Sequence, residues 1–527
     1  MPFLSKVSSH LARHSVAYGL ITISAVIQLL IVSQPLEFLL ATVLPDDAFY
    51  YFEIARNITQ GLGSTFDGTN LTNGYHPLWL LTLIPIFTHF SSGGPLDIEP
   101  VRAALHLAVF FNVITACVLY RILGYFTKDR VLAAFGLFAY LFNPFVLFET
   151  VNGLETALSL LLVSVFFLVT LRLQEKDTTR TYVLLGLIGG AMILARLDTA
   201  FYAAAVLCWV LFRKGFKYGF PRAVGSGLII CAVVVPLFVV NYMTFGMVLT
   251  SASQTGTLVS HTLNAQDNGT SLFEVTKATV YHFYNGVDQL LLTRTGAPWL
   301  FLILFGVWCA SLIRSGKIPR RLSDIQAIHA LGLGFVLLFL ANVVVRWGGR
   351  PWYFMSFEFF VSIMAVLAVA SLSLSGRYKQ ITVLLLAVLM TFFFYVSWSK
   401  EIRNQHVNQV EMYSMASWMN EQPPEDARVG VFNAGIIGYF STREVINLDG
   451  LVNNAVFHAM EERRVWEYIA NERIAYIADF PLSLTYRYKS FFGVEDIFMY
   501  LQPRHTILLT PTNRNPEGIV LYEVVVP

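Results

Sequence analysis

Long apolar segments separated by short polar stretches occupy most of residues 1–399. A helix that crosses the hydrocarbon core of a bilayer needs about 20 mainly apolar residues. By this criterion the chain carries about 11 spans, and the pattern predicts an α-helical polytopic membrane protein. The expected spans centre on residues 16–36, 101–123, 131–148, 154–172, 182–196, 199–213, 224–244, 298–313, 325–346, 353–374 and 381–398.

A further apolar run, Pro77 to Phe90, decides which side each loop faces. It is short for a span, begins with Pro and is followed by Ser-Ser-Gly-Gly-Pro. If it does not cross, all basic loops share one side with the N-terminus, as the positive-inside rule requires. We therefore expect this run to lie in the outer interface. The basic loops are Lys128/Arg130, Arg172–Arg180, Arg213–Arg222, Arg314–Arg321 and Arg377/Lys379.

This sidedness places two long loops and the tail on the extracytoplasmic face. The loops run over residues 37–100 and 245–298. The first apolar segment lacks a small-x-small cleavage site before Pro35, so we expect a retained span rather than a signal peptide. The resulting organisation is a transmembrane domain over residues 1–399 and an extracytoplasmic domain over residues 400–527.

The tail changes pattern after Lys400, where strand and helix signals alternate. Alternation of this kind predicts a small α/β domain. The spacing Gly435-x-x-Gly438 lacks the third glycine of a dinucleotide fingerprint, so we do not expect a nucleotide site. Strand-like runs occupy Arg428–Phe432, Glu444–Leu448, Ile474–Phe480 and Ile519–Val526, and a helical pattern spans Val456–Asn471.

Composition supports a membrane protein and excludes nucleic acid as a partner. The chain is 55% hydrophobic and 13% charged, whereas soluble domains average about 25% charged residues. The net charge is +2 and the basic residues are scattered, without the patch that nucleic acid requires. The cysteines Cys117, Cys208, Cys231 and Cys309 fall in apolar segments without metal-ligand spacing, so we expect small core residues.

Candidate chemistry begins with Asp46 and Asp47, which follow the first apolar segment directly. Helical spacing places Asp46 with Tyr50 on one face and Asp47 with Tyr51 on the next. One interpretation is an N-terminal pair that complements the helix dipole, which accounts well for only one carboxylate. The other is a catalytic carboxylate at the mouth of a membrane cavity. We favour the catalytic interpretation, and both remain open.

Further polar groups are expected near the same outer face. His76 precedes Pro77 and either lines the cavity or is an exposed residue at a helix start. Glu155, Arg196 and Asp198 lie at span ends, where charged side chains are normally paired or functional. A structural ion pair is the alternative for this group.

The segment Arg346-Trp-Gly-Gly-Arg350-Pro-Trp352-Tyr353 joins two expected spans on the outer side. Arginine suits bidentate contacts to phosphate, and the two glycines allow close backbone approach. Arg346 and Arg350 are therefore candidates for a phosphate clamp. The alternative is a pair of interfacial arginines within an aromatic belt.

With these residues in place, the chain resembles the GT-C superfamily of membrane glycosyltransferases. That group includes protein O-mannosyltransferases, the lipid A aminoarabinose transferase and arabinofuranosyltransferases. The resemblance rests on Asp46-Asp47 after the first span, a long outer loop with amphipathic segments, many spans and an outer soluble tail. The acidic pair is Asp-Asp followed by aromatic residues, not the Asp-Glu of the mannosyltransferases, so their substrates do not carry over.

The resemblance implies a polyprenyl-phosphate-linked sugar as donor and one acid of the first outer loop as base. The hypothesis is that Asp46 or Asp47 deprotonates an acceptor hydroxyl, which attacks the anomeric carbon with inversion. Arg350 and Arg346 would offset the charge of the leaving phosphate. A metal is not required, although Asp47 with Glu155 offers oxygen ligands to Mg²⁺ or Mn²⁺.

Several roles around this hypothesis stay open. The acceptor is a glycan, a lipid or a protein, and the loop Asn447–Asn453 is a candidate for its site. Some aromatic side chains either stack on sugar rings or, as we favour, anchor the membrane interface. These are Tyr50, Tyr51, Trp79 and Trp352.

The main rival is a transporter or flippase of lipid-linked sugars. Such folds often contain internal repeats and charges in the middle of spans. The two halves of this sequence show no repeat, and its notable charges lie at span ends on one face. This pattern disfavours transport without excluding it.

Overall fold

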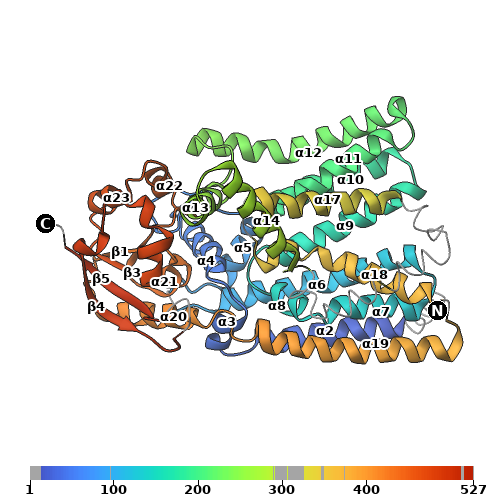
Figure 1. The fold of residues 1–527 in the computed structure, drawn as a ribbon, viewed down its shortest axis with the longest axis horizontal. Coiled ribbons are helices and arrows are strands. Elements are labelled where there is room, and N and C mark those ends of the chain that lie inside the picture. The colour runs from blue at the N-terminus through green and yellow to red at the C-terminus, as the bar shows by residue number, and fades with distance from the viewer. Residues whose placement is uncertain are drawn as a thin grey trace.

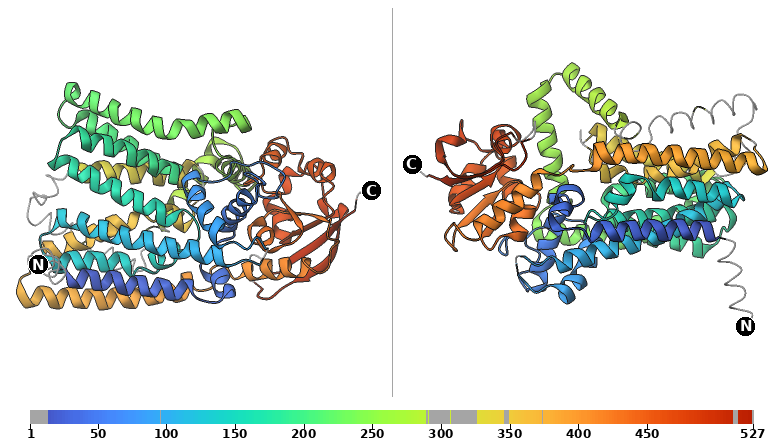
Figure 2. Two further views of the ribbon diagram at one scale, coloured as in Figure 1. Left: turned by 180° about the vertical axis from the view of Figure 1, so that it is seen from behind. Right: turned by 90° about the horizontal axis from the view of Figure 1, so that it is seen from below.

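The computed structural model of the protein describes residues 14–94, 96–288, 290, 306, 326–345, 349–372, 374–511 and 516–525. Within these residues a bundle of long helices carries a domain with a five-stranded sheet at one end (Figure 1). A layer of shorter helices separates the bundle from the sheet domain, as the two further views in Figure 2 also show.

Among the described residues, six helices are long and apolar enough to cross a membrane. The chain is therefore an integral, multi-pass membrane protein, as predicted. The span expected at residues 298–313 lies outside the described residues, apart from residue 306. The long helices are α2 (Ser15–Val32), α6 (Glu99–Phe126), α9 (Thr156–Glu175), α12 (Phe216–Phe245), α17 (Gln326–Leu340) with η3 (Ala341–Val345), and α19 (Gly376–Ser397) with η5 (Trp398–Ile402).

Four shorter apolar helices run beside the long ones and coincide with expected spans. They are α7 (Arg130–Leu141), α10 (Thr179–Ala195), α11 (Ala200–Phe212), which follows η1 (Leu197–Thr199), and α18 (Phe357–Ser371). Helix α10 packs closely on α12, because Gly186 and Gly190 leave room for Ile229 and Val233.

The cysteines do not lie in the protein core. Cys117, Cys208 and Cys231 are free and exposed on the surface of the bundle. Our expectation of core residues was wrong for these three, because a helix facing lipid can carry apolar side chains on its outer face. Cys309 lies outside the described residues.

The basic junctions of the bundle lie at its end away from the sheet (Figure 1). Two ion-pair clusters connect them. Asp177, after α9, accepts hydrogen bonds from Arg213 at 3.1 Å and Lys214 at 2.6 Å, both after α11. Lys379 of α19 pairs with Asp129 before α7. These loops therefore share one end of the bundle; Arg314–Arg321 lie outside the described residues.

The layer between bundle and sheet contains the helix expected in the interface. Helix α5 (Pro77–Phe90) has 14 residues and an internal Pro85. At 1.5 Å per residue it extends about 21 Å, less than a bilayer core of about 30 Å. It packs on α4 (Asp46–Thr59), α6 and α10. The other helices of this layer are α3 (Leu36–Thr42), α8 (Pro144–Glu149), α13 (Ser251–Asn268) and α14 (Leu272–Asp288).

The C-terminal domain is an α/β domain with a mixed sheet of order β2-β1-β3-β5-β4. Strands β1, β2 and β3 are parallel, and β5 is antiparallel to both β3 and β4. The strands are β1 (Arg428–Val431), β2 (Glu444–Asn447), β3 (Tyr476–Asp479), β4 (Leu501–Ile507) and β5 (Ile519–Val524), and the helices are α20 (Asn408–Met419), α21 (Ala434–Phe440), α22 (Asn454–Glu461) and α23 (Val465–Asn471).

Two features of this domain differ from the sequence pattern. The helical pattern over Val456–Asn471 forms two helices, α22 and α23, because the chain turns where Arg463 takes a φ of 55°. The sequence pattern did not predict strand β4, because much of the strand is exposed and Pro503 interrupts it. Three 3₁₀ or π segments complete the domain: η6 (Ser483–Arg487), η7 (Lys489–Phe491) and η8 (Ile497–Tyr500).

Close packing of α21 on α4 joins the sheet domain to the layer beneath it. The glycines of the Gly435-x-x-Gly438 motif make this approach possible. A Cβ atom at Gly435 would lie 2.1 Å from the carbonyl oxygen of Asp46, and one at Gly438 would lie 2.4 Å from the Phe66 ring. Both glycines therefore serve the contact between the two parts of the protein.

The first prediction concerns this contact. Gly435→Ala places a methyl group against the α4 backbone, so we expect a loss of about 1–3 kcal/mol in stability and a lower thermal unfolding midpoint in detergent. Gly225→Ala in α12 is the control, because a Cβ there meets no atom within 4 Å. Equal midpoints for Gly435→Ala and the wild type would contradict this role.

Candidate active site

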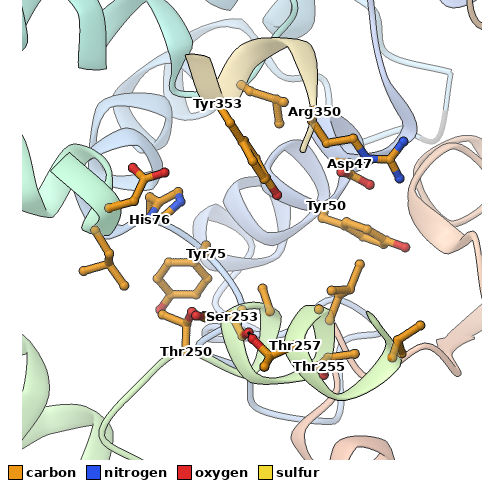
Figure 3. A pocket seen from close by; sticks show the side chains of 18 of the residues that line it. Asp47, Tyr50, Tyr75, His76, Thr250, Ser253, Thr255, Thr257, Arg350 and Tyr353 are labelled. Carbon is orange, nitrogen blue, oxygen red and sulfur yellow. Dashed lines mark hydrogen bonds between the residues drawn. The ribbon is translucent and has the colours of Figure 1, made fainter. Parts of the chain in front are cut away.

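A cavity of about 350 Å³ lies where the end of the bundle nearest the sheet, the intermediate helices and the C-terminal domain meet. Figure 3 shows side chains around it from the bundle end, such as Arg350 and Tyr353, and from the intermediate layer, such as Asp47, His76 and Ser253. It is lined by groups from α4, the Gly74–His76 turn, the segments around Glu155 and Arg196, α13, the Gly349–Tyr353 segment, Leu451 and η6. Most of the predicted site residues therefore meet in one place.

The two adjacent aspartates have different surroundings. The carboxylate of Asp46 accepts backbone hydrogen bonds from Gly435 at 3.2 Å and Ile436 at 2.7 Å, at the start of α21. Asp47 lines the cavity, whereas Asp46 is not among the lining residues. Successive residues of a helix point about 100° apart, so the contact of Asp46 with α21 turns Asp47 toward the cavity.

Burial governs the protonation of the groups at this junction. It raises the pKa of Asp46 to about 8, although its two backbone hydrogen bonds act in the opposite direction. Burial likewise raises the pKa of Asp449 to about 7. The Tyr50 hydroxyl donates to Asp449 at 3.1 Å and accepts from the Ala434 N–H at 3.2 Å. Tyr50 thus fastens α4 to the C-terminal domain while one face of its ring borders the cavity.

Glu155 is the centre of an ion-pair network at the membrane end of the cavity. One of its oxygens accepts from Arg196 at 3.1 Å, and the other accepts from the Tyr51 hydroxyl at 3.1 Å. Arg196 also pairs with Asp198, with its Nε 2.8 Å from Oδ1. His76 lies near Glu155, with 3.8 Å between Nε2 and Oε1. The network holds buried charges in mutual contact, as ionised side chains away from water require.

Aromatic and amide groups complete this network. The Arg196 guanidinium lies over the Tyr353 ring, 4.5 Å from its centroid. The side-chain amide of Asn342 donates to Asp198 at 3.1 Å, and Trp352 is buried at the cavity wall. Every charge in this network has an opposite charge beside it.

A tight turn places Glu155 at the cavity. Gly153 takes a φ of +79°, and a Cβ there would lie within 3.0 Å of Phe52 and Ala48 of α4. The Trp79 indole donates to the Gly153 carbonyl at 3.0 Å. Trp79 is fully buried, so the expectation that it anchors the membrane interface was wrong. Its ring instead supports the turn that carries Glu155.

Arg350 enters the cavity from the segment before η4 (Pro351–Phe354). Figure 3 shows it at the same end of the cavity as Asp47. Its guanidinium is exposed and lies 5.9 Å from the Trp352 ring centroid. Within the described part of the chain, neither Arg350 nor Asp47 forms a side-chain ion pair. Arg346, the other predicted arginine, lies outside the described residues.

Arg487 is a cavity residue that sequence reasoning missed. It ends η6 in the C-terminal domain and lines the cavity with Tyr488. No motif surrounds it in the sequence, because its position depends on how the tail folds against α4.

One wall of the cavity is neutral and hydroxyl-rich. Helix α13 presents Ser253, Gly256, Thr257 and Ser260, which share one face at spacings of three and four residues. The helix is tied to the C-terminal domain because the Ser251 hydroxyl donates to the Leu451 carbonyl at 2.8 Å. Small side chains keep this side open, and hydroxyls of this kind can exchange hydrogen bonds with sugar hydroxyls.

The residues that we considered for a metal do not fit one well. Both oxygens of Glu155 already accept hydrogen bonds, from Arg196 and Tyr51. The described residues contain no group of three or more His, Cys, Asp or Glu side chains placed to hold a metal ion. A cation between Asp47 and Glu155 would have to share the Glu155 carboxylate with Arg196 and Tyr51.

Comparison with known proteins identifies the fold. A domain of unknown function (DUF8728) matches residues 400–515, and no curated protein matches the sequence. ArnT from Cupriavidus metallidurans, solved in the apo state, is similar over 97% of this chain and 98% of its own, with 10% identity and a TM-score of 0.59.

Archaeal oligosaccharyltransferases have a similar fold. AglB from Archaeoglobus fulgidus, solved with an inhibitory peptide and a dolichol-phosphate, matches 91% of this chain and 71% of its own, with 11% identity and a TM-score of 0.54. The apo form of the oligosaccharyltransferase from Archaeoglobus fulgidus matches with 14% identity, over 92% of this chain and 73% of its own, with a TM-score of 0.53. The chain therefore has the GT-C fold over nearly its whole length, as the resemblance predicted.

The second prediction follows from the raised pKa of Asp46. The native state keeps the Asp46 proton up to about pH 8, whereas the unfolded chain releases it at about pH 3.9. The tighter binding of this proton by the native state contributes to the free energy of unfolding. The contribution is complete below about pH 4 and is lost as the pH rises toward 8. We expect the thermal unfolding midpoint to decrease as the pH is raised from 5 to 8.5. The decrease should be less steep in Asp46→Asn.

The control for this prediction is Asp426→Asn, which changes an exposed aspartate of the same domain. It should leave the pH dependence of the midpoint at the wild-type slope. An unchanged slope in Asp46→Asn would show that Asp46 does not keep its proton in the native state.

Proposed function

We propose that this protein is a membrane glycosyltransferase that uses a polyprenyl-phosphate-linked sugar. It transfers the sugar to an acceptor hydroxyl on the extracytoplasmic side, with inversion, and Asp47 acts as the base. The shared GT-C fold supports the class of enzyme. The observation that carries the assignment of the base is that Asp47 lines the cavity, whereas the Asp46 carboxylate is bonded to Gly435 and Ile436.

The proposed reaction uses groups already in the cavity. Asp47 takes the proton of the acceptor hydroxyl as its oxygen attacks the anomeric carbon of the donor sugar. The bond from that carbon to the phosphate oxygen breaks, and the electron pair leaves with the phosphate. Arg350 stabilises the charge that grows on the phosphate, with Arg346 as the second arginine of the same segment.

The position of the cavity suits a substrate whose lipid stays in the membrane. The elements that line the cavity lie at the end of the bundle opposite the basic loops (Figure 1). By the positive-inside rule this end is extracytoplasmic. We propose 11 spans, with residues 1–399 as the membrane domain and residues 400–527 as an extracytoplasmic domain. A phosphate at the outer headgroup level of the plasma or inner membrane can reach this cavity while its polyprenyl chain remains among lipids.

The other cavity residues are proposed to position substrates. The network of Glu155, Arg196 and Asp198 fixes the membrane end of the site, and His76 is near enough to contact a sugar hydroxyl. Tyr353 and Trp352 form the wall between this network and Arg350. Tyr50 and Tyr51 hold α4 in place through their hydroxyls. The acceptor remains a glycan, a lipid or a protein.

The third prediction tests the base. Asp47→Asn removes the proton acceptor without changing its size, so we expect the rate of transfer to fall about 10²–10⁴-fold. The assay measures release of polyprenyl phosphate from a panel of radiolabelled polyprenyl-phosphate pentoses and hexoses, with membrane extract as the acceptor source. Asp46→Asn is the comparison and should lose less activity, because its side-chain oxygen can still accept one of the two hydrogen bonds from α21.

Two outcomes would contradict the proposal. Full activity in Asp47→Asn would remove Asp47 as the base. Binding of the labelled lipid by the wild type without turnover would favour a carrier or flippase of lipid-linked sugars.

The fourth prediction concerns metal ions. Because Arg350 is available to the leaving phosphate and Glu155 is occupied by Arg196, we expect transfer to continue after divalent cations are removed. The measurement compares rates before and after treatment with a chelator, followed by addition of Mg²⁺ or Mn²⁺. Loss of activity with the chelator and recovery with either ion would contradict this expectation.

A further inference from the structure

We infer that the C-terminal domain completes the donor site, and that Arg487 binds the phosphate of the lipid-linked donor together with Arg350. This inference rests on the proposed function. It assigns a role to the C-terminal domain, whose residues 400–515 match a domain of unknown function.

The position of Arg487 is fixed by the fold of the C-terminal domain. It ends η6, and the nearby side chains Leu484 and Tyr488 are buried in the hydrophobic core of the C-terminal domain. The Tyr488 ring stacks on Phe432 of the β1 end, with 4.4 Å between centroids. The Ser483 hydroxyl accepts from the Asn433 side chain at 3.2 Å. The backbone that carries Arg487 is therefore anchored on both sides.

The guanidinium of Arg487 remains available for a ligand. Among the described residues it forms no hydrogen bond or ion pair, and it lies 5.3 Å from the centroid of the Tyr488 ring. The acids of its own domain are occupied. Asp479 accepts from the backbone of Phe432 at 2.9 Å and of Asn433 at 3.0 Å, and Asp449 accepts from Tyr50 and from the Leu451 N–H.

The charges of the cavity divide into two groups. Glu155, Arg196 and Asp198 form the closed network, with a formal charge of −1. The remaining charged residues, Asp47, Arg350 and Arg487, give +1, and none of the three has an ion-pair partner in the described chain. The two arginines therefore leave one positive charge unbalanced, which favours an anion near their guanidinium groups.

A phosphate with a growing charge fits this open group. The donor phosphodiester carries one negative charge, and the released phosphomonoester carries about −1.5 to −2 at pH 7. Two guanidinium groups offer ten N–H donors, or about five each, and one arginine comes from each part of the protein. We therefore expect Arg487 to act on both binding and release of the phosphate.

A purely structural role for Arg487 makes different predictions. In that case the residue would only balance Asp47, Asp449 and Asp479, which all lie within its electrostatic range. Its removal would then change stability and leave the recognition of phosphate unchanged. A direct measurement of lipid binding separates the two roles.

The fifth prediction uses the full-length protein in nanodiscs with two probes, polyprenyl phosphate and the uncharged polyprenol. Wild type should bind the phosphate more tightly than the alcohol. We expect Arg350→Gln and Arg487→Gln each to reduce this preference about 10–100-fold, since a hydrogen bond to a charged group contributes about 1.5–3 kcal/mol. Lys489→Gln is the control, because it removes an exposed cation of the same domain that does not line the cavity.

The possible results separate the proposed function from the inference about the C-terminal domain. If wild type shows no preference for the phosphate, the proposed function fails. If Arg350→Gln loses the preference and Arg487→Gln keeps it, the inference about the C-terminal domain is overturned while the proposed function stands. If Arg487→Gln does not fold, Arg487→Lys tests the same point. It should keep part of the preference for the phosphate. Its rate of transfer should fall by more than the loss of folded protein, measured by its thermal unfolding midpoint, accounts for. An Arg487→Lys protein with wild-type preference and rate would overturn the inference.

Discussion

The hydrogen bonds between the Asp46 carboxyl and the first turn of α21 are the constraint on which the site depends. They join α4 to the C-terminal domain, and the glycine at position 435 lets the two backbones approach. Because neighbouring helical residues point in different directions, this contact also orients Asp47. One carboxylate holds the two parts of the protein together, and the other is left in the space between them.

The charged residues that line the cavity fall into a paired group and an unpaired group. An ionised side chain at this depth is stable when it is paired, and Glu155, Arg196 and Asp198 satisfy one another. Asp47, Arg350 and Arg487 form no ion pair within the described residues, and each comes from a different region of the chain. The paired group forms one wall of the cavity, and we propose that the unpaired group takes part in the reaction.

The sequence predicted the large-scale organisation because hydropathy and basic residues depend on local composition. Long apolar runs identified the spans, and the basic loops identified their shared side. It could not distinguish Asp46 from Asp47, because the contact that gives them different surroundings joins residues 390 positions apart. Arg487 was missed for the same reason: η6 reaches the cavity only through the fold of the tail.

The remaining differences also have physical causes. Two glycines that resembled part of a nucleotide motif serve helix packing, and Trp79 supports a turn because its indole finds a buried carbonyl. Exposed strand β4 carried no alternating apolar pattern. In each case tertiary contacts decided the role of a residue whose local sequence allowed more than one.

The most direct test is a cryo-EM structure of the protein with polyprenyl phosphate bound. Our account predicts the phosphate in the cavity, in contact with Arg350 and Arg487 and beside Asp47, while Asp46 still accepts from Gly435 and Ile436. A phosphate bound outside the cavity, or an Asp46 carboxylate released from α21 and turned toward the lipid phosphate, would contradict it.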